Sequence, residues 1–326
     1  MNNINPETDC LIVGAGLAGA IAAHTLTQHG LNCLVLDKGR GYGGRMASRY
    51  HDHARWDHGA QFFTVRSPIF QTYVDDWLQH DIVRLWSHGF TPQQDGYPRY
   101  RGQPGMTAIA KHLLHNIPTH LNTKVEEITF ANGRWHIQTT HNNYHSRTLV
   151  ITPPAPQALS LFPPNTLPHE TTQTLGQIKY APCFALLLTL NQPSPIPPPG
   201  ALQLNGEPIH WLADNQQKGI SAIPTITIHA GPHFSQTHFD APHHIITKKL
   251  IDAAAQWLNP NHITGQQLHR WRYSHPTQLH PNRYLFTSPQ QPVIFAGDAF
   301  HEARVEGAAL SGRSAALHLY QQCAPF

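Results

Sequence analysis

The hydrophobic positions near the N-terminus predict a strand, a helix and a second strand in quick succession. Residues 9–13 and 33–36 are short, mostly apolar runs, as in strands buried on both faces of a parallel sheet. Between them, residues 17–29 form an alanine-rich segment of helical length, and Gly30 follows as a C-terminal stop. This order predicts an α/β fold built on a parallel sheet.

Further along the chain, hydrophobic runs predict more of the same sheet and a separate, proline-rich region. We expect additional strands at 123–128, 135–139, 148–152, 184–190, 209–212, 226–230 and 293–296. We expect additional helices at 105–114, with Thr107 as a cap, at 241–258 and at 305–316. The strands from 184 to 230 indicate a mainly antiparallel sheet with helices.

These elements predict two domains. Residues 1–66, 104–153 and 288–326 would form a discontinuous, Rossmann-like domain that binds a dinucleotide. Residues 67–103 and 154–287 would form a second, α+β domain that lies over it as a lid.

The first strand runs into a glycine-rich turn whose spacing suits a dinucleotide. Gly14 permits a tight turn, Gly16 lets a pyrophosphate approach the backbone, and Gly19 lets the helix pack close to the strand. The helix N-terminus directs unpaired N–H groups at the phosphates. Asp37 ends the second strand about twenty residues later, where a carboxylate accepts hydrogen bonds from ribose hydroxyls.

A second glycine-rich segment distinguishes FAD from NAD. After Asp37 come Lys38 and then Gly43, Gly44 and Arg45, and a guanidinium at this place can bind pyrophosphate oxygens in a fork. A third segment, the 293–296 strand ending in Gly-Asp and the following helix, agrees with this interpretation. The positive end of that helix can stabilise negative charge at N1 and C2=O of a reduced flavin.

These segments resemble the glutathione-reductase-like FAD family, and within it the branch containing monoamine oxidase, phytoene desaturase and renalase. Four further stretches resemble the renalase family, specifically its bacterial members: 56–64, 102–110, 269–273 and 304–308. The resemblance places Val125 near the adenine and Asp298 near the ribityl or phosphate region. Motifs and resemblance together assign FAD contacts to Gly14, Ala15, Gly16, Leu17, Ala18, Gly19, Asp37, Lys38, Gly44, Arg45, Gly59, Ala60, Gln61, Phe62, Val125, Asp298, Arg304 and Val305.

The resemblance implies a reaction. Renalase-like enzymes oxidise dihydropyridine isomers of NAD(P)H: a hydride passes to flavin N5, and O2 reoxidises the flavin to give hydrogen peroxide. Orientation supplies most of this catalysis, so no acid–base residue is required. Arg270 and Arg272 either attract the substrate's phosphates or are plain surface charges, and Phe300 is a further candidate on the substrate side.

Two alternatives stay open. An amine oxidase needs a neutral amine between two aromatic rings, and the 299–303 loop offers Phe300 but no tyrosine or tryptophan. A non-catalytic FAD-binding protein is the other. A lipid desaturase is disfavoured because no membrane-docking apolar helix is visible.

Composition limits the remaining classes. The 326-residue chain has a formal net charge of +3 and no basic run, which argues against nucleic-acid binding. Its longest apolar stretch, near 183–190, is too short to span a bilayer, and a strand that begins by residue 9 leaves no room for a signal peptide. We expect a soluble, cytoplasmic protein that uses a small-molecule substrate and O2.

Cysteine and histidine change the picture only slightly. The four cysteines form no CxxC pair and predict reduced thiols, and none lies near residues 297–298, so FAD should be bound non-covalently. The 26 histidines fall mostly in loops, so we expect a solvated surface rather than a metal site. The sequence does not fix the substrate isomer, NAD against NADP, or the oligomeric state.

Overall fold

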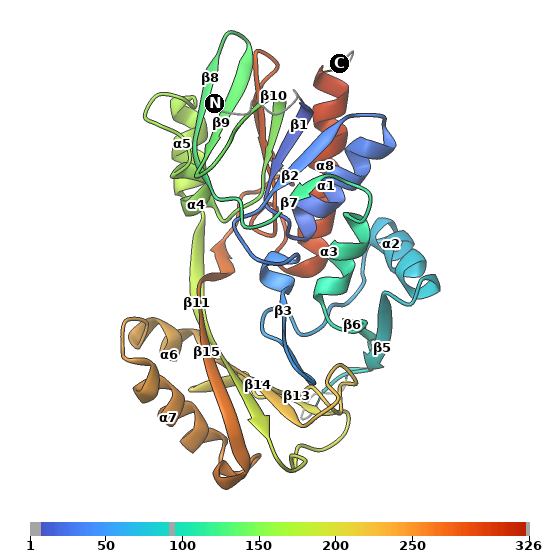
Figure 1. Ribbon diagram of the computed structural model, residues 1–326, viewed down its shortest axis with the longest axis vertical. Coiled ribbons are helices and arrows are strands. Elements are labelled where there is room, and N and C mark those ends of the chain that lie inside the picture. The colour runs from blue at the N-terminus through green and yellow to red at the C-terminus, as the bar shows by residue number, and fades with distance from the viewer. Residues whose placement is uncertain (1–7, 91–94, 324–326) are drawn as a thin grey trace.

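The computed structural model describes residues 8–90 and 95–323, so residues 1–7 and 324–326 of the expected first domain lie outside the described residues. Two sheets lie end to end and are joined by the long strands β11 and β15 (Figure 1). β1 of the first sheet begins the described chain, and α8, which ends it, packs against the same sheet.

The first sheet is mainly parallel. Among the described residues it runs β16-β17-β10-β1-β2-β7, with β9 paired to β10 and β8 to β9. Its strands are β1 (Thr8–Val13), β2 (Cys33–Leu36), β7 (Thr119–His120), β8 (Val125–Ala131), β9 (Arg134–Thr139), β10 (Asn143–Ile151), β16 (Leu285–Ser288) and β17 (Gln291–Phe295). The central strand β1 pairs in parallel with β10 and β2, which is why its side chains are apolar on both faces.

Alternate residues of these strands enter two different cores. Ile12 and Val35 face a core closed by α1 (Leu17–Gln28), α2 (Pro68–Gln79), α3 (Thr107–Leu113) and α8 (Arg304–Cys323). Leu11 and Leu34 face a core closed by the β8–β9 hairpin, α4 (Ala155–Leu159) and α5 (His169–Gly176). α8 lies directly against α1, since a Cβ on Gly312 would stand 2.2 Å from the carbonyl oxygen of Ala18.

The second sheet is antiparallel throughout. Its order is β12-β13-β14-β11-β15, with β11 (Lys179–Leu190), β12 (Ala201–Gln203), β13 (Ile209–Asp214), β14 (Thr225–Ala230) and β15 (Ile263–Gln278). The helices α6 (Pro232–Thr237) and α7 (His243–Ala254) cover one face, and the other face turns toward the first sheet (Figure 1). The short helix η2 (Pro260–His262) leads into β15.

Residues 67–103 bridge the two sheets. α2 buries Phe70, Val74 and Trp77 in the core of the first sheet, whereas Phe90 packs with Trp211 of β13. The hairpin β5 (Val83–Ser87) and β6 (Arg99–Gly102) connects these contacts. This segment was expected in the lid, and its aromatic residues instead tie it to both halves.

A small hairpin leads from the dinucleotide loops toward the second sheet. It follows the single-turn helix η1 (Gly44–Met46) and consists of β3 (Ser48–His51) and β4 (Ala54–Asp57). Thr107 does not cap α3 as predicted, because its Oγ1 instead accepts a hydrogen bond from the Ser48 N–H at 2.6 Å. None of the described helices is long and apolar enough to cross a membrane.

Candidate cofactor and substrate cavity

A cavity of about 1230 Å³ opens where the carboxyl ends of the parallel strands face the second sheet. It extends from the loop after β1 to the exposed face of β13 and β15. The predicted site residues on its wall are Gly16, Leu17, Ala18, Arg45, Gly59, Ala60, Gln61, Phe62, Asp298, Arg304 and Val305. These residues come from four separate stretches of sequence.

The two glycine-rich segments lie side by side at one end of this cavity. Gly16 and Gly43 form an isolated parallel bridge. A Cβ on Gly44 would stand 3.4 Å from the Cα of Gly16, so the two backbones are in close contact. A Cβ on Gly19 would stand 2.0 Å from the carbonyl oxygen of Gly14, so only glycine allows α1 to start this close to β1. α1 has no side-chain cap and no acidic residue in its first turn, which leaves its N–H groups available to an anion.

Asp37 holds both segments in place. Its Oδ2 accepts a hydrogen bond from the Ala15 N–H at 2.6 Å, and its Oδ1 accepts one from the Gly39 N–H at 2.6 Å. The carboxylate therefore fixes the loop geometry at the tip of β2, where the ribose contact was predicted.

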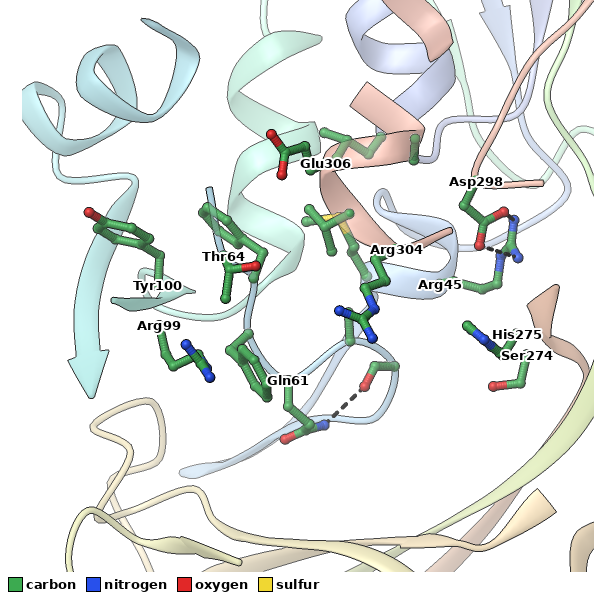
Figure 2. Close-up of a pocket in the computed structure, with 18 of the residues that line it drawn as sticks. Arg45, Gln61, Thr64, Arg99, Tyr100, Ser274, His275, Asp298, Arg304 and Glu306 are labelled. Atoms are coloured by element: carbon green, nitrogen blue, oxygen red, sulfur yellow. Dashed lines mark hydrogen bonds and ion pairs between the residues drawn. The ribbon is translucent and has the colours of Figure 1, made fainter. Parts of the chain in front are cut away.

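Arg45 and Asp298, separated by most of the chain, form a forked ion pair at the cavity wall (Figure 2). One guanidinium nitrogen lies 2.8 Å from Oδ2 of Asp298 and the other lies 2.6 Å from Oδ1. The ring of Tyr180 lies 5.9 Å from the guanidinium carbon, and burial raises the pKa of this phenol to about 12, so it stays neutral. The pair holds a guanidinium beside the uncapped start of α1.

The stretch after β4 forms the floor of the cavity. Gln61 donates from Nε2 to the carbonyl oxygens of Asp57 and Gly59, at 2.5 Å and 3.0 Å. Its Oε1 is buried and has no hydrogen-bond partner among the described residues. A buried acceptor without a donor is costly, so its position suits a ligand that supplies an N–H.

The start of α8 carries a strained residue at the cavity wall. Arg304 has φ +85°, a conformation rare outside glycine, and its cationic side chain lies at the positive end of a helix. In the view of Figure 2 it lies between Gln61 and the Arg45–Asp298 pair. Glu306, two residues later, accepts hydrogen bonds from the N–H groups of Arg66 and Ser67 and so ties α8 to the start of α2. Strain of this kind collects at functional sites.

Several wall residues were not anticipated from the sequence. Trp211 and Trp271 come from the exposed face of the second sheet, and Arg99 and Tyr100 come from β6. Strand alternation in β15 was the signal that could have found Trp271, because it follows Arg270, which packs on the helical side. In β13 a register shift lies between Ile209 and Trp211, and His210 lines the cavity beside Trp211, so alternation gave no such signal there. Arg99 pairs with Asp95 at 2.6 Å and lies over the ring of Phe62.

Two histidines on this wall are neutral. Burial lowers the pKa of His58 to about 3, and burial lowers the pKa of His229 to about 4. His58 stacks on Trp271, and the ring nitrogen Nε2 of His229 lies 3.3 Å from the His58 carbonyl oxygen. The rings of Trp211, Trp271, His58 and His229 on this wall are therefore uncharged, and the ion pair of Arg99 with Asp95 also lines the cavity.

The structure does not bring Arg270 and Arg272 to the cavity. Strand alternation turns both toward the helical side of β15, where Arg270 bonds the carbonyl oxygens of Phe239 and Ala241 and Arg272 lies over the Phe239 ring. The expected contact with substrate phosphates is therefore wrong for this conformation, because the same alternation places Trp271 on the wall instead.

Phe300 is buried in the core beside His280 and is also away from the cavity. Its proposed place on the substrate side is a second correction, since the Phe300 ring packs into the core while Glu302 of the same turn lines the cavity. Lys38 is exposed and bonds Gln157, and Val125 is a core residue at the start of β8; neither lines the cavity.

Comparison with known proteins assigns the family. The sequence profile described as flavin containing amine oxidoreductase matches residues 84–319, and that described as NAD(P)-binding Rossmann-like domain matches residues 12–77. The chain belongs to the flavin containing amine oxidoreductase family. The family's flavin indicates FAD as the cofactor, and the profiles together span nearly all of the described sheets.

Members of solved structure share the fold of this flavoenzyme at low identity. Cyclohexylamine oxidase from Brevibacterium oxydans aligns with TM-score 0.71 and 14% identity, covering 97% of this chain and 99% of that one. A fatty acid isomerase from P. acnes aligns with TM-score 0.68 and 14% identity, covering 95% and 98%. Ketocytochalasin monooxygenase of Aspergillus clavatus is 28% identical over 151 residues, 45% of this chain and 21% of its own length. The chain thus matches about a fifth of that relative.

The residues present fit FAD. The uncapped start of α1 and the N–H groups of Arg45 that Asp298 does not occupy offer donors to the pyrophosphate, and the bare backbones of Gly16 and Gly43 leave room for it to approach. The unpartnered Oε1 of Gln61 and the start of α8 lie further along the same cavity, where the flavin ring would extend. Bound there, the flavin supplies an acceptor for a hydride or for two electrons.

Proposed function

We propose that this flavoenzyme oxidises dihydropyridine isomers of NAD(P)H whose hydride lies on the wrong ring carbon, as in the renalase family. The observation that carries the proposal is the cavity wall opposite the dinucleotide loops, which holds the neutral rings of Trp211 and Trp271 and the Arg99 guanidinium, with Trp211 and Arg99 both against the ring of Phe62. Flat aromatic faces suit a dihydropyridine ring, and a guanidinium suits the phosphates that such a nucleotide carries.

The net reaction balances with O2 as oxidant. The dihydropyridine gives up a hydride, which is one proton with two electrons, and becomes an aromatic pyridinium. O2 takes up this proton, the two electrons and one further proton from solvent, and becomes hydrogen peroxide. The substrate gives up no separate proton, so the neutral side chains of His58 and His229 suit this reaction. The protein's task is to hold the donor carbon against the flavin and to keep the site dry.

We also propose that FAD is held non-covalently. Cys183 is the described cysteine on the cavity wall, and burial raises the pKa of its thiol to about 12. A thiol this weakly acidic is a poor nucleophile. Denaturation in acid should release all of the yellow colour into the supernatant, whereas colour that stays with the precipitate would indicate a covalent bond.

Amine oxidation is the second candidate. The family profile and the cyclohexylamine oxidase fold support it. Against it, Trp211 on β13 and Trp271 on β15 are separated by β14 and β11, so their backbones stand about 14 Å apart and the two rings do not flank one amine.

Anaerobic flavin reduction separates the candidates. The holoenzyme is mixed in a stopped-flow instrument with 2-dihydro-NAD(P), 6-dihydro-NAD(P), ordinary 4-dihydro-NAD(P)H, and primary amines that include cyclohexylamine and putrescine. We expect rapid bleaching by a 2- or 6-isomer, slow bleaching by the 4-isomer and none by amines. Reduction by an amine with inert dihydropyridines would transfer the assignment to amine oxidation, and reduction by neither would favour a non-catalytic FAD-binding protein.

A further inference from the structure

We propose that Asp76, His80 and His112 form a binding site for one divalent transition-metal ion of the Zn²⁺ class. Asp76 lies on α2, His80 directly follows that helix, and His112 lies on α3; none of the three lines the flavin cavity. The sequence alone gave no reason to connect them, because His112 lies 32 residues beyond His80 on a different helix.

The geometry brings one ligand atom from each residue together. These three atoms all lie within 4.8 Å of one another. One oxygen of Asp76 lies 3.3 Å from Nδ1 of His80 and the other lies 3.7 Å from Nε2 of His112. The two imidazole rings have centroids 5.6 Å apart. A single carboxylate therefore stands between two imidazoles that approach from different helices.

The distances are close to those of a metal centre. Bonds of about 2.0–2.1 Å in a tetrahedral Zn²⁺ site place neighbouring ligand atoms about 3.3–3.4 Å apart. The 3.3 Å from Oδ1 of Asp76 to Nδ1 of His80 lies near this value, whereas the 3.7 Å to Nε2 of His112 is measured from Oδ2. Because Nδ1 of His80 also lies 2.9 Å from the Asp76 carbonyl oxygen, metal binding requires these partly exposed side chains to rotate. Two nitrogen donors and one oxygen donor form a ligand set used by Zn²⁺, and a water would complete the tetrahedron.

Packing fixes the two helices that carry these ligands. Asp76 and His80 are four residues apart at the C-terminal end of α2, so they share one face of the helix turn. The opposite face of α2 is anchored by Phe70, Val74 and Trp77, and α3 is anchored by Ile109 and Leu113 in the same core. The scaffold is therefore ordered without the ion, and binding should require little rearrangement of the backbone.

Protonated histidines paired with the carboxylate would give a similar arrangement without metal. The two explanations differ in what they predict above neutral pH. An ion pair weakens as the imidazoles lose their protons, whereas metal binding strengthens because a ligand must be deprotonated.

The test is cobalt and zinc titration of tag-free, chelator-treated holoenzyme at pH 7.5. Co²⁺ reports geometry through its visible absorption, and Zn²⁺ competition gives the affinity. The test variants are Asp76→Asn and His80→Ala/His112→Ala. The control is His243→Ala/His244→Ala, which removes two adjacent exposed histidines from α7. A chain with 26 histidines has background affinity, so this control is essential.

We expect one Co²⁺ per chain with intense tetrahedral bands, displaced by Zn²⁺, in the wild type and in the control. Loss of even an indirect partner weakens metal sites by about 10–100-fold, so the His80→Ala/His112→Ala variant should lose at least about 100-fold in affinity. Asp76→Asn removes the carboxylate ligand while both histidines stay in place, and it should also weaken binding of Co²⁺ and Zn²⁺. Equal stoichiometry and affinity in all four proteins, or an octahedral spectrum unchanged by the test substitutions, would overturn the proposal.

Discussion

The ammonium group of Lys218 lies 2.7 Å from Oδ2 of Asp57, and both side chains are fully shielded from solvent. Lys218 comes from the turn after β13 and Asp57 ends β4, so the pair joins the second sheet to the floor of the cavity. Lys218 also donates to the carbonyl oxygen of Gln61, and Asp57 accepts from the N–H of Met106. Burial lowers the pKa of Lys218, with the charge of Asp57 opposing that effect.

Lys218→Met should destabilise the protein strongly. It leaves the Asp57 carboxylate buried without its cation, a loss of about 3–5 kcal/mol in the free energy of unfolding. Urea unfolding followed by tryptophan fluorescence measures it. Lys218→Met/Asp57→Asn should recover part of the loss, and Lys248→Met, which breaks an exposed pair with Asp252, should change little. A Lys218→Met midpoint equal to that of the wild type would show that the pair does not contribute.

Gly312→Ala should disturb the contact between α8 and α1. The added Cβ would stand 2.2 Å from the Ala18 carbonyl oxygen, within the backbone of a buried helix. Overpacking of this kind costs about 1–3 kcal/mol or more, and thermal unfolding would show it. Gly176→Ala is the matched control, because a Cβ there meets nothing within 4 Å. A lower melting temperature for the control than for Gly312→Ala would contradict this account.

Arg45→Ala should yield largely colourless protein. It removes the guanidinium that pairs with Asp298 and whose remaining N–H groups we expect to bind the pyrophosphate. Arg45→Lys keeps the charge without the fork and should retain part of the FAD, since a guanidinium binds two oxygens at once. The ratio of flavin to protein absorbance reports occupancy. Arg84→Ala, on the exposed β5, should stay fully yellow, and full occupancy in Arg45→Ala would refute the assignment.

Stability should fall as the pH drops below about 6.5. His58 and His229 have folded-state pKa values near 3 and 4, against 6.5 when exposed, so between these values the unfolded chain binds more protons than the folded one. The contribution of these two neutral histidines to the free energy of unfolding is complete above pH 6.5. It should decline by on the order of a few kcal/mol by pH 4. His58→Phe should flatten this slope in urea titrations, whereas His141→Gln, on an exposed histidine, should leave it unchanged.

Arg99 and Arg272 should differ in their effect on substrate binding. If the substrate carries phosphates, Arg99→Ala should raise KM by about tenfold, the loss of one charge-assisted contact, with a smaller change in kcat. Arg272→Ala should alter neither constant, because its side chain lies on the helical side of β15. Steady-state peroxide release measures both. A larger effect at Arg272 would mean that the strand alternation has been misassigned.

Local patterns in the sequence determined the dinucleotide-binding half. Uninterrupted apolar runs predicted β1, β2 and β17. The glycines between β1 and β2 predicted the turn at Gly14 and the close packing at Gly19, because the backbone geometry of such a turn depends only on residues that are neighbours in sequence. The family followed from those same short segments. Only the tertiary structure decided what faces the cavity: one-residue alternation in β15 puts Trp271 on the wall and Arg270 and Arg272 behind it, and a turn buries Phe300. It also joined Lys218 to Asp57 and His112 to His80. These relationships depend on which elements pack together and in what register, and distant packing leaves no trace in the spacing of residues along the chain.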